Sequence, residues 1–600
     1  MSESSNIARH LPLMAARQPD APAIKVPRGR TAAGHIDYLT LSFRELDAEV
    51  DAWVTHLAGK GVRTGDRVLV MVRQGLPLIA AAFALFKLGA VPVIIDPGMG
   101  RKNFLACVAR SKPGVLLGIP LAQVMSHIFR AAFITVQVRV WVSGSSTAQL
   151  SAGGPVSRPA AVGREADPPQ QTVSRSASDL AAVLFTSGST GAPKGVCYEH
   201  GMFDAQVRLV RDTYGIAPGE VDLPMLPIFA LFNPALGLTT IVPEIDPSRP
   251  ATVDPARIVQ AIQQEGVTNS FGSPTLWRKI FDHCLAHNIT LPSMHRVLCA
   301  GAAVPASLWA DAPRVLVNGD LHSPYGATEV LPVATVSEEE FPPRATIGSL
   351  LGWPLPANQV KIIALHDGPL ATLAAAREVP PGEIGEIIVT GPTVTREYDQ
   401  LPEATALAKI LQQNGDEWRA SSADKSRPHS PATAQAGRLV PCWQQPATGS
   451  AERDRSQLGG SAAVWHRMGD AGYLDAAGRL WFCGRIAERV VTRTSVMHTE
   501  PCEQVFRGFP GVARCALVGL GERGQQEPAL VVQPVKPLSG ADQTRLAEEL
   551  RALAMQHPHT VPIGRILFHP SFPVDVRHNA KIHRLTLARW AAEQTSHQTN

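Results

Sequence analysis

The chain has 600 residues, of which 45% are hydrophobic and 18% charged, so it is too long for a single domain and too apolar for a disordered chain. Its 56 Lys and Arg residues against 52 Asp and Glu leave a net charge of +4, which argues against nucleic acid as the main partner. The eight cysteines show neither a Cys-x-x-Cys pair nor a metal-ligand spacing, which favours a reducing, cytoplasmic location. We expect no transmembrane segment, because the most apolar stretch, residues 76–86, is only about half a membrane span.

Helix and strand patterns alternate through the first part of the chain. Such alternation predicts an α/β fold, in which a parallel sheet carries helices on its faces. A stretch rich in Ser, Gly and Pro at 143–179 is expected to be a connecting loop, after which the alternation resumes. The first predicted elements are a helix at 43–61, a strand at 67–72, a helix at 78–89 and a strand at 91–96.

The last third of the chain contains a polar tract and a second α/β pattern. Residues 412–463 combine Ser, Gly, Pro and both charge signs with little periodicity, which predicts a disordered insertion. We therefore expect a large domain at 1–487, interrupted by this insertion, and a small C-terminal domain at 488–600. The predicted elements of the small domain are strands at 515–520, 529–535 and 565–570 and a helix at 543–555.

A loop rich in hydroxyl groups and glycine directly follows the apolar run at 180–185. Glycines let the backbone approach a polyphosphate closely, hydroxyl and main-chain N–H groups donate hydrogen bonds to its oxygens, and a lysine supplies positive charge. The loop therefore predicts a phosphate-binding site, although its lysine lies between proline and glycine, unlike the lysine of a P-loop. The candidate phosphate-binding residues are Thr186, Ser187, Gly188, Ser189, Thr190, Gly191 and Lys194.

This loop resembles the signature of the adenylate-forming superfamily of acyl-CoA synthetases, nonribosomal adenylation domains and luciferases. Two further segments resemble motifs of that superfamily and follow in its order. One would lie along the adenine of ATP. The other would stack a tyrosine on the adenine, place a threonine at the α-phosphate and hold Mg²⁺ with a glutamate. The first segment contains Gly301, Ala302 and Ala303, and the second consists of Tyr325, Gly326, Ala327, Thr328 and Glu329.

Three later residues extend the resemblance. Asp470 would bind the ribose hydroxyls, Arg485 would add a ribose or phosphate contact, and Lys581 stands where the family has its catalytic lysine. The resemblance implies ATP and Mg²⁺ as cofactors. It also implies a body of two α/β subdomains with a small β-barrel, and a mobile α+β C-terminal domain that turns about a hinge at Glu488. The candidate catalytic residues are Lys581, Thr328 and Glu329.

One further motif is typical of a different function, dinucleotide binding, but its surroundings do not fit that function. Residues 519–524 satisfy the G-x-G-x-x-G pattern of dinucleotide-binding folds. In those folds a helix opens on the last glycine, whereas here the following residues, QQEPALVV, predict another strand. We therefore expect no nicotinamide or flavin site.

The expected acyl-binding segment departs from the family pattern. It reads LPIFALFNPALG from residue 226, so Ala230 replaces the histidine that the family usually has there. Its aromatic and aliphatic side chains suit a long alkyl chain, and Asn233 is a candidate for meeting a substrate hydroxyl. The candidate pocket residues are Phe229, Leu231, Phe232, Asn233 and Gly272.

Together with the segments at 83–98, 271–277 and 572–582, this region looks most like the branch of olefin-pathway β-lactone synthetases. The resemblance implies that a long-chain 2-alkyl-3-hydroxy fatty acid is activated as acyl-AMP and then closed to a β-lactone by its own hydroxyl. It also implies partner enzymes of an olefin or β-lactone pathway. A ligase that passes the acyl group to CoA or to a carrier-protein thiol remains the alternative. A non-catalytic relative is disfavoured, because Lys194, Glu329, Asp470, Arg485 and Lys581 are all present.

Overall fold

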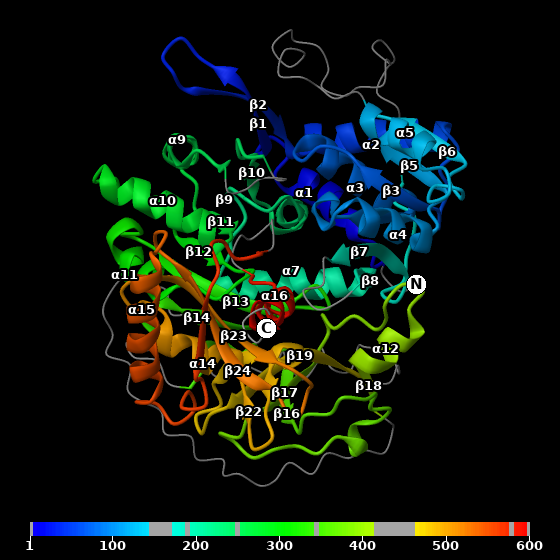
Figure 1. The fold of residues 1–600 in the computed structure, drawn as a ribbon. Coiled ribbons are helices and arrows are strands. Elements are labelled where there is room, and N and C mark those ends of the chain that lie inside the picture. The colour runs from blue at the N-terminus through cyan, green and yellow to red at the C-terminus, as the bar shows by residue number, and fades with distance from the viewer. Residues whose placement is uncertain are drawn as a thin grey trace.

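The computed structural model describes residues 4–142, 171–186, 192–246, 252–340, 347–412, 463–574 and 581–596. Two large sheets with surrounding helices form the body, and a smaller C-terminal unit packs against it (Figure 1). The predicted insertion at 412–463 lies, apart from its two end residues, outside the described residues. The short 3-10 helices are η1 (Ile7–Arg9), η2 (Pro97–Met99), η3 (Pro227–Leu231), η5 (Glu338–Glu340), η6 (Leu373–Ala375) and η8 (Ile486–Glu488).

The N-terminal sheet is parallel apart from its last strand, which pairs antiparallel with its neighbour. Both faces are buried: Val68 and Val70 pack into one core, and Leu69 between them packs into the other. Its strand order is β6 (Val138–Trp141), β5 (Val115–Gly118), β3 (Arg67–Met71), β4 (Val91–Ile95), β7 (Leu180–Thr186) and β8 (Lys194–Glu199). The helices around it are α1 (His10–Arg17), α2 (Phe43–Gly59), α3 (Leu76–Leu88), α4 (Arg101–Ser111) and α5 (Pro120–Ile128).

Local signals set the ends of the two helices that were predicted here. At the start of α2, Ser42 Oγ accepts a hydrogen bond from the Glu45 N–H group, and the Glu45 carboxylate accepts one from the Ser42 N–H group. α3 ends at Gly89, whose φ of 70° lies in the left-handed region that glycine adopts most readily. Both predicted helices and the strands that follow them are confirmed.

The second sheet has 14 strands and joins a parallel part to an antiparallel part. Its strands are parallel from β1 to β13, and β2 and the strands from β14 to β16 pair antiparallel with their neighbours. The strand order is β16 (Gln359–Ile363), β17 (Gly385–Thr390), β19 (Val464–Leu474), β20 (Leu480–Arg485), β15 (Ser349–Pro354), β14 (Val330–Ser337), β13 (Asp320–Ala327), β12 (Arg296–Cys299), β11 (Asn269–Gly272), β9 (Val221–Asp222), β10 (Thr239–Ile241), β1 (Pro22–Arg30) and β2 (Ile36–Ser42), with β18 (Lys409–Leu411) paired to β19. The helices of this part are α7 (His200–Tyr214), α8 (Asn233–Leu236), α9 (Pro255–Glu265), α10 (Pro274–Ala286), α11 (Ala306–Val315) and α12 (Pro402–Ala408).

The antiparallel strands form a barrel-like unit. Val330 of β14 and Ile362 of β16 belong to one buried core, although their strands stand at opposite ends of this segment of the sheet. The small barrel that the sequence resemblance implies is therefore continuous with the parallel sheet, because β13 pairs with β14 along most of its length.

The C-terminal unit has its own cores and contacts the body through polar groups. Ser349 Oγ of β15 donates a hydrogen bond of 2.6 Å to Glu500 Oε1 of this unit. The predicted strands and helix are confirmed, and the 519–524 motif forms the turn of a β-hairpin, as expected. The elements are β21 (Val490–Val491), β22 (Val496–Met497), α14 (Thr499–Phe506), β23 (Val512–Leu520), β24 (Glu527–Pro534), α15 (Gly540–Ala554), β25 (Arg565–Phe568) and α16 (Arg584–Ser596).

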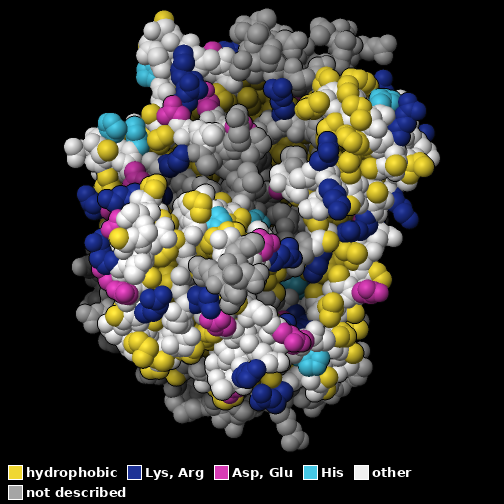
Figure 2. All heavy atoms as spheres, viewed as in Figure 1, with side chains coloured by type: hydrophobic (Ala, Val, Ile, Leu, Met, Phe, Trp, Pro, Cys, Tyr) yellow, Lys and Arg dark blue, Asp and Glu magenta, His cyan; other side chains and the backbone are white. Residues whose placement is uncertain are grey.

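The surface carries both signs of charge. Figure 2 shows basic and acidic side chains on the same face of the molecule, in keeping with the small net charge. Across the described ranges, no helix combines the length and the apolar character needed to cross a membrane.

Candidate active site

The predicted nucleotide-binding residues lie at strand ends. Thr186 ends β7 and Lys194 begins β8, and the two residues are paired across these strands. Gly301, followed by Ala302 and Ala303, comes just after β12, and its φ of 97° favours glycine. The other predicted phosphate-binding residues, Ser187, Gly188, Ser189, Thr190 and Gly191, lie outside the described residues.

A buried carboxylate joins two strands of the barrel-like unit to β13 of the parallel part of the sheet. Asp470 of β19 is 2% exposed, and its Oδ2 accepts a hydrogen bond of 2.6 Å from the Tyr325 hydroxyl of β13. Arg485 of β20 pairs with Asp470 in register and places Nη1 3.0 Å from Oδ1. Despite this ion pair, Oδ1 has no hydrogen-bond partner in the structure. A buried carboxylate oxygen without a hydrogen-bond partner is costly, so the site fits a ligand that brings hydroxyl groups, such as a ribose.

The C-terminal unit brings a second cation to this carboxylate. Burial raises the pKa of Asp470, and the charges of Arg485 and Lys581 oppose that rise. Lys581 immediately precedes Ile582, which forms an isolated antiparallel bridge with Val574. The predicted catalytic lysine therefore lies close enough to the predicted ribose-binding residue for its charge to act on that carboxylate, although 111 positions separate them in the sequence.

A second cluster surrounds Glu329, at the end of the same motif as Tyr325. Glu329 Oε1 accepts a hydrogen bond of 2.7 Å from the Tyr398 hydroxyl, and Lys194 Nζ lies 4.7 Å from the centre of the Tyr398 ring. Within the described ranges, no three His, Cys, Asp or Glu side chains gather closely enough to hold a metal ion. Glu329 supplies one carboxylate, and a single carboxylate acting together with the substrate phosphates is a common way to hold Mg²⁺ in nucleotide sites.

Tyr398 and Lys409 belong to this cluster but were not predicted. Lys409 Nζ donates a hydrogen bond of 3.2 Å to Thr395 Oγ1, and both the N–H and the hydroxyl group of Thr395 bond to the Glu329 carbonyl. Burial lowers the pKa of Lys409 to about 7, with Glu329 opposing that shift and Lys194 adding to it. The one available signal was a lysine at the start of the apolar strand β18, where a charged side chain requires a partner.

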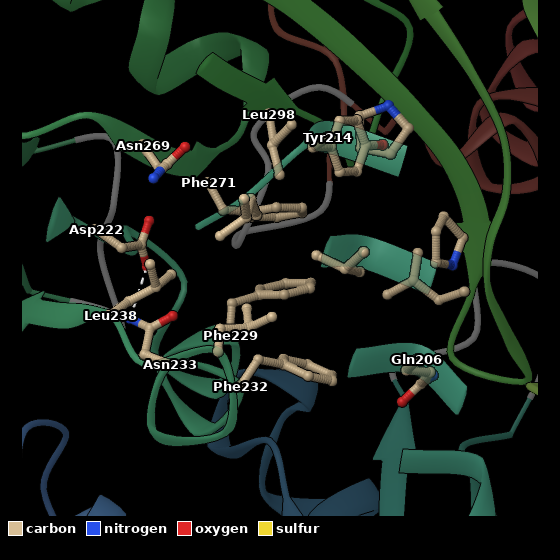
Figure 3. Close-up of a pocket in the computed structure, with 16 residues that line it drawn as sticks. Gln206, Tyr214, Asp222, Phe229, Phe232, Asn233, Leu238, Asn269, Phe271 and Leu298 are labelled. Atoms are coloured by element: carbon tan, nitrogen blue, oxygen red, sulfur yellow. Dashed lines mark hydrogen bonds between the residues drawn. The ribbon is translucent and has the colours of Figure 1, made fainter. Parts of the chain in front are cut away.

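An apolar cavity lies between α7, η3 and the ends of β11 and β12 (Figure 3). Its open space, including solvent at the mouth, amounts to about 650 Å³. Of the predicted pocket residues, Phe229, Phe232 and Asn233 line it, and the Phe229 ring stacks on that of Phe271 at 3.7 Å. The cavity therefore offers a mainly aromatic and aliphatic surface, suited to an alkyl chain.

Two predicted pocket residues, Leu231 and Gly272, do not line this cavity, so their assignment to the substrate pocket stays a prediction. Residues three apart share one side of a 3-10 helix, so Phe229 and Phe232 face the cavity while Leu231 packs into the N-terminal core. Gly272 packs against Met225, whose Cε would lie 2.4 Å from an added Cβ. Asn233 lines the cavity, but both hydrogens of its amide are donated to the scaffold, to Asp222 and Thr240.

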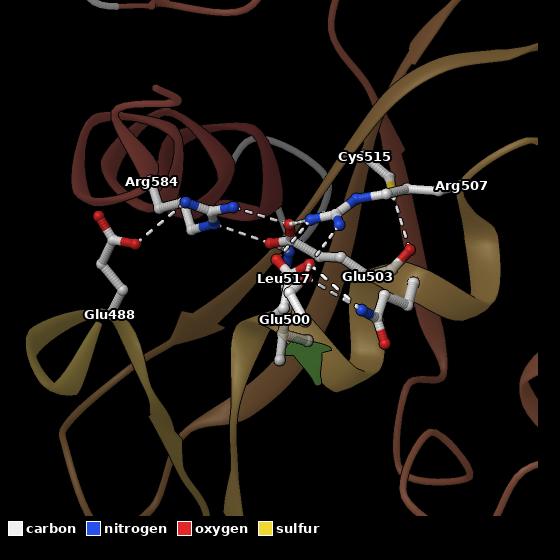
Figure 4. Close-up of polar contacts among 9 residues, drawn as sticks. Glu488, Glu500, Glu503, Arg507, Cys515, Leu517 and Arg584 are labelled. Atoms are coloured by element: carbon white, nitrogen blue, oxygen red, sulfur yellow. Dashed lines mark hydrogen bonds and ion pairs between the residues drawn. The ribbon is translucent and has the colours of Figure 1, made fainter. Parts of the chain in front are cut away.

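Glu488 is part of a buried ion-pair network (Figure 4). Its carboxylate lies 3.0 Å from the Arg584 guanidinium, which also pairs with Glu503 at 2.7 Å. Burial raises the pKa of Glu488, and the charge of Arg584 opposes the shift. Because Arg584 follows Lys581 by three residues, this network ties the end of the body to the lysine segment. The hinge at Glu488 stays a proposal.

Comparison with known proteins agrees with these features. A family model described as AMP-binding enzyme matches residues 13–399. The chain is 42% identical to the olefin β-lactone synthetase of Stenotrophomonas maltophilia and 40% identical to that of Xanthomonas campestris pv. campestris, in each case over 99% of both chains. Among solved structures, the amide bond synthetase McbA from Marinactinospora thermotolerans is 21% identical with a TM-score of 0.70, and the match covers 98% of this chain and 99% of that chain. This last likeness concerns the fold.

Proposed function

Because the chain belongs to the AMP-binding enzyme family, we propose that it activates a long-chain 2-alkyl-3-hydroxy fatty acid with ATP and closes it to a β-lactone. The observation that carries the proposal is the identity of 42% and 40% with two olefin β-lactone synthetases over almost the whole of each chain. The apolar cavity supports the choice of a fatty acid. Partner enzymes that supply the hydroxy acid and consume the lactone belong to the same proposal.

The nucleotide would be held by the two polar clusters. Asp470 Oδ1, buried and without a hydrogen-bond partner, accepts from a ribose hydroxyl, and Arg485 adds a positive charge beside it. Lys194 and Thr328 would contact the phosphates. Mg²⁺, when bound by Glu329 and the phosphate oxygens, supplies further positive charge against the phosphates.

In the first half-reaction, an oxygen of the fatty-acid carboxylate attacks the α-phosphorus of ATP, and pyrophosphate leaves. Both reacting groups are anionic, so they must be held together against their repulsion. Lys581 does this by contacting the carboxylate and the α-phosphate at once. The effect of its charge on the pKa of Asp470 supports this role.

In the second half-reaction, the substrate's own β-hydroxyl oxygen attacks the carbonyl carbon of the acyl-AMP. The bond from that carbon to the AMP oxygen breaks, AMP leaves with the electron pair, and the hydroxyl proton passes to the AMP phosphate or to solvent. The nucleophile is tethered, so the protein has only to fold the chain and keep water from the anhydride. The cavity walls formed by Phe229, Phe232 and Phe271 serve both purposes.

The test is to incubate the purified protein with ATP, Mg²⁺ and a 2-alkyl-3-hydroxy fatty acid, with and without CoA. We expect AMP, pyrophosphate and β-lactone in equal amounts without CoA. Product formation that requires CoA, with a thioester as the product, would favour the ligase alternative and contradict the lactone step.

A further inference from the structure

A buried glutamine on the cavity wall has an unused acceptor. Gln206 of α7 lines the cavity and is 2% exposed, yet its amide oxygen Oε1 has no hydrogen-bond partner. Buried polar atoms are nearly always paired in native proteins, because a carbonyl oxygen removed from water loses its hydrogen bonds. An unpaired oxygen on the wall of a ligand cavity therefore points to a hydrogen-bond donor on the ligand.

The neighbouring Tyr198 hydroxyl favours one orientation of this amide. The Tyr198 hydroxyl donates its single hydrogen to the Thr328 carbonyl. Burial raises the pKa of Tyr198, and a side-chain hydrogen bond with Gln206 acts against that rise. Because Tyr198 donates its hydrogen to the Thr328 carbonyl, the Gln206 amide can meet the hydroxyl oxygen only as a donor. Its nitrogen therefore faces Tyr198, which leaves the oxygen as the group available to a ligand.

The same contacts place Gln206 at the reacting end of the cavity. Through Tyr198 it is connected to Thr328, the residue expected at the α-phosphate. In Figure 3, Gln206 lies across the cavity from Asp222 and Asn233, whose polar groups bond to each other. The β-hydroxyl of a 3-hydroxy acid is attached two carbons from the carboxyl carbon. It therefore lies at the end of the cavity where Gln206 stands.

We propose that Gln206 accepts a hydrogen bond from the β-hydroxyl of the substrate and thereby selects 3-hydroxy acids and aims the hydroxyl oxygen at the acyl carbon. This inference rests on the proposed function. A hydrogen-bond acceptor suits the step, because it binds the hydroxyl through its hydrogen and leaves the lone pairs of the hydroxyl oxygen free to attack. A neutral amide does not remove the proton, so Gln206 is a positioning residue, and the proton leaves to the AMP phosphate or to solvent.

The test compares two proteins, each with two substrates. Wild type and Gln206→Leu are each given a 2-alkyl-3-hydroxy acid and the same acid without the hydroxyl, and kcat/KM is measured for pyrophosphate release. We expect Gln206→Leu to lose about 10- to 100-fold with the hydroxy acid, and lactone formation to fall at least as much. With the acid that lacks the hydroxyl, the two proteins should agree within about threefold.

Two outcomes would overturn the proposal. An equal loss of kcat/KM with both acids would mean that Gln206 has only a structural role in α7. An unchanged preference for the hydroxy acid would mean that Gln206 does not contact the hydroxyl. Gln206→Glu is the matched second variant, because its carboxylate keeps an acceptor and should retain the preference for the hydroxy acid. Thermal unfolding and ATP binding of both variants check their folding.

The readouts also separate this proposal from the proposed function. Preference between the two acids is measured at pyrophosphate release, before any ring forms. A wild type that prefers the hydroxy acid but forms no lactone would contradict ring closure and leave the role of Gln206 in selection intact. A wild type that forms lactone, combined with a Gln206→Leu variant that keeps the full preference for the hydroxy acid, would contradict the role of Gln206 and leave ring closure intact.

Discussion

Replacing Asp470 by asparagine tests how the nucleotide is held. The substitution keeps the size of the side chain but removes its charge. In the structure, Oδ2 accepts from the Tyr325 hydroxyl at 2.6 Å, and Oδ1 faces Arg485 at 3.0 Å without a hydrogen bond. The single amide oxygen of the variant can still accept the hydrogen bond from the Tyr325 hydroxyl. The NH₂ group then points toward Arg485 and toward the ribose position.

The expected loss follows from the hydrogen bond between a ribose hydroxyl and a charged acceptor. Such a bond contributes about 1.5–3 kcal/mol, which corresponds to roughly a 10- to 150-fold change in affinity. The ribose does not react, so the contact is equally strong in the ground state and in the transition state. We therefore expect the KM for ATP to rise by this factor in Asp470→Asn, with kcat changed by less than about threefold.

The assay is pyrophosphate release at varied ATP concentration, with the dissociation constant of ATP measured by calorimetry. Tyr325→Phe is the control, because it removes the bond to Oδ2, keeps the ring and leaves Oδ1 for the ribose. Its KM should rise by less than about fivefold. A folded Asp470→Asn protein with unchanged ATP affinity, or one with lower kcat and unchanged KM, would refute the assignment of Asp470 to the ribose.

Three further predictions concern the lysine, the hinge and the pH dependence. Lys581→Met should lower pyrophosphate release at least about a hundredfold while ATP still binds in calorimetry, and near-normal release would contradict the role of this lysine. Glu488→Gln should slow pyrophosphate release about tenfold, because Arg584 keeps only Glu503, whereas lactone formation from supplied acyl-AMP should not change; an equal slowing of both steps would count against a hinge. Burial lowers the pKa of His200 from its usual 6.5 to about 4, with Arg175 adding to the shift, so the folded state favours the neutral ring. The contribution of His200 to stability is therefore present above pH 6.5 and is lost, by about 3 kcal/mol, as the pH falls toward 4. His200→Gln keeps an acceptor for the Ile7 N–H group, so its thermal unfolding should depend less on pH over this range; identical pH profiles for the two proteins would contradict the shift.

The parts of the fold that local sequence determines could be predicted. The ends of α2 and α3 follow from a capping box and a C-terminal glycine, which act within one helical turn. The turn at 519–524 could be predicted because the residues after it have the pattern of an apolar strand and not of a helix. The motif from Tyr325 to Glu329 is contiguous in the chain, so the sequence alone could mark it.

The contacts that complete the site depend on tertiary pairing and could not be predicted. Lys409 reaches the cluster because β18 pairs with β19, which places Lys409 opposite His466. No local pattern encodes that pairing across the 413–462 tract. Leu231 lies away from the cavity because its segment is a 3-10 helix, in which residues three apart share one side. The unpaired oxygen of Gln206 is visible only once the fold has buried this side chain in the cavity wall.

The central claim is that adenylation is followed by attack of the substrate's own hydroxyl. A 2-alkyl-3-hydroxy fatty acid with ¹⁸O in both carboxylate oxygens tests it most directly, in a reaction with ATP and without CoA. The account predicts one ¹⁸O in AMP, one in the lactone carbonyl and an unlabelled ring oxygen that comes from the hydroxyl. A lactone with both labels, or AMP without label, would contradict it.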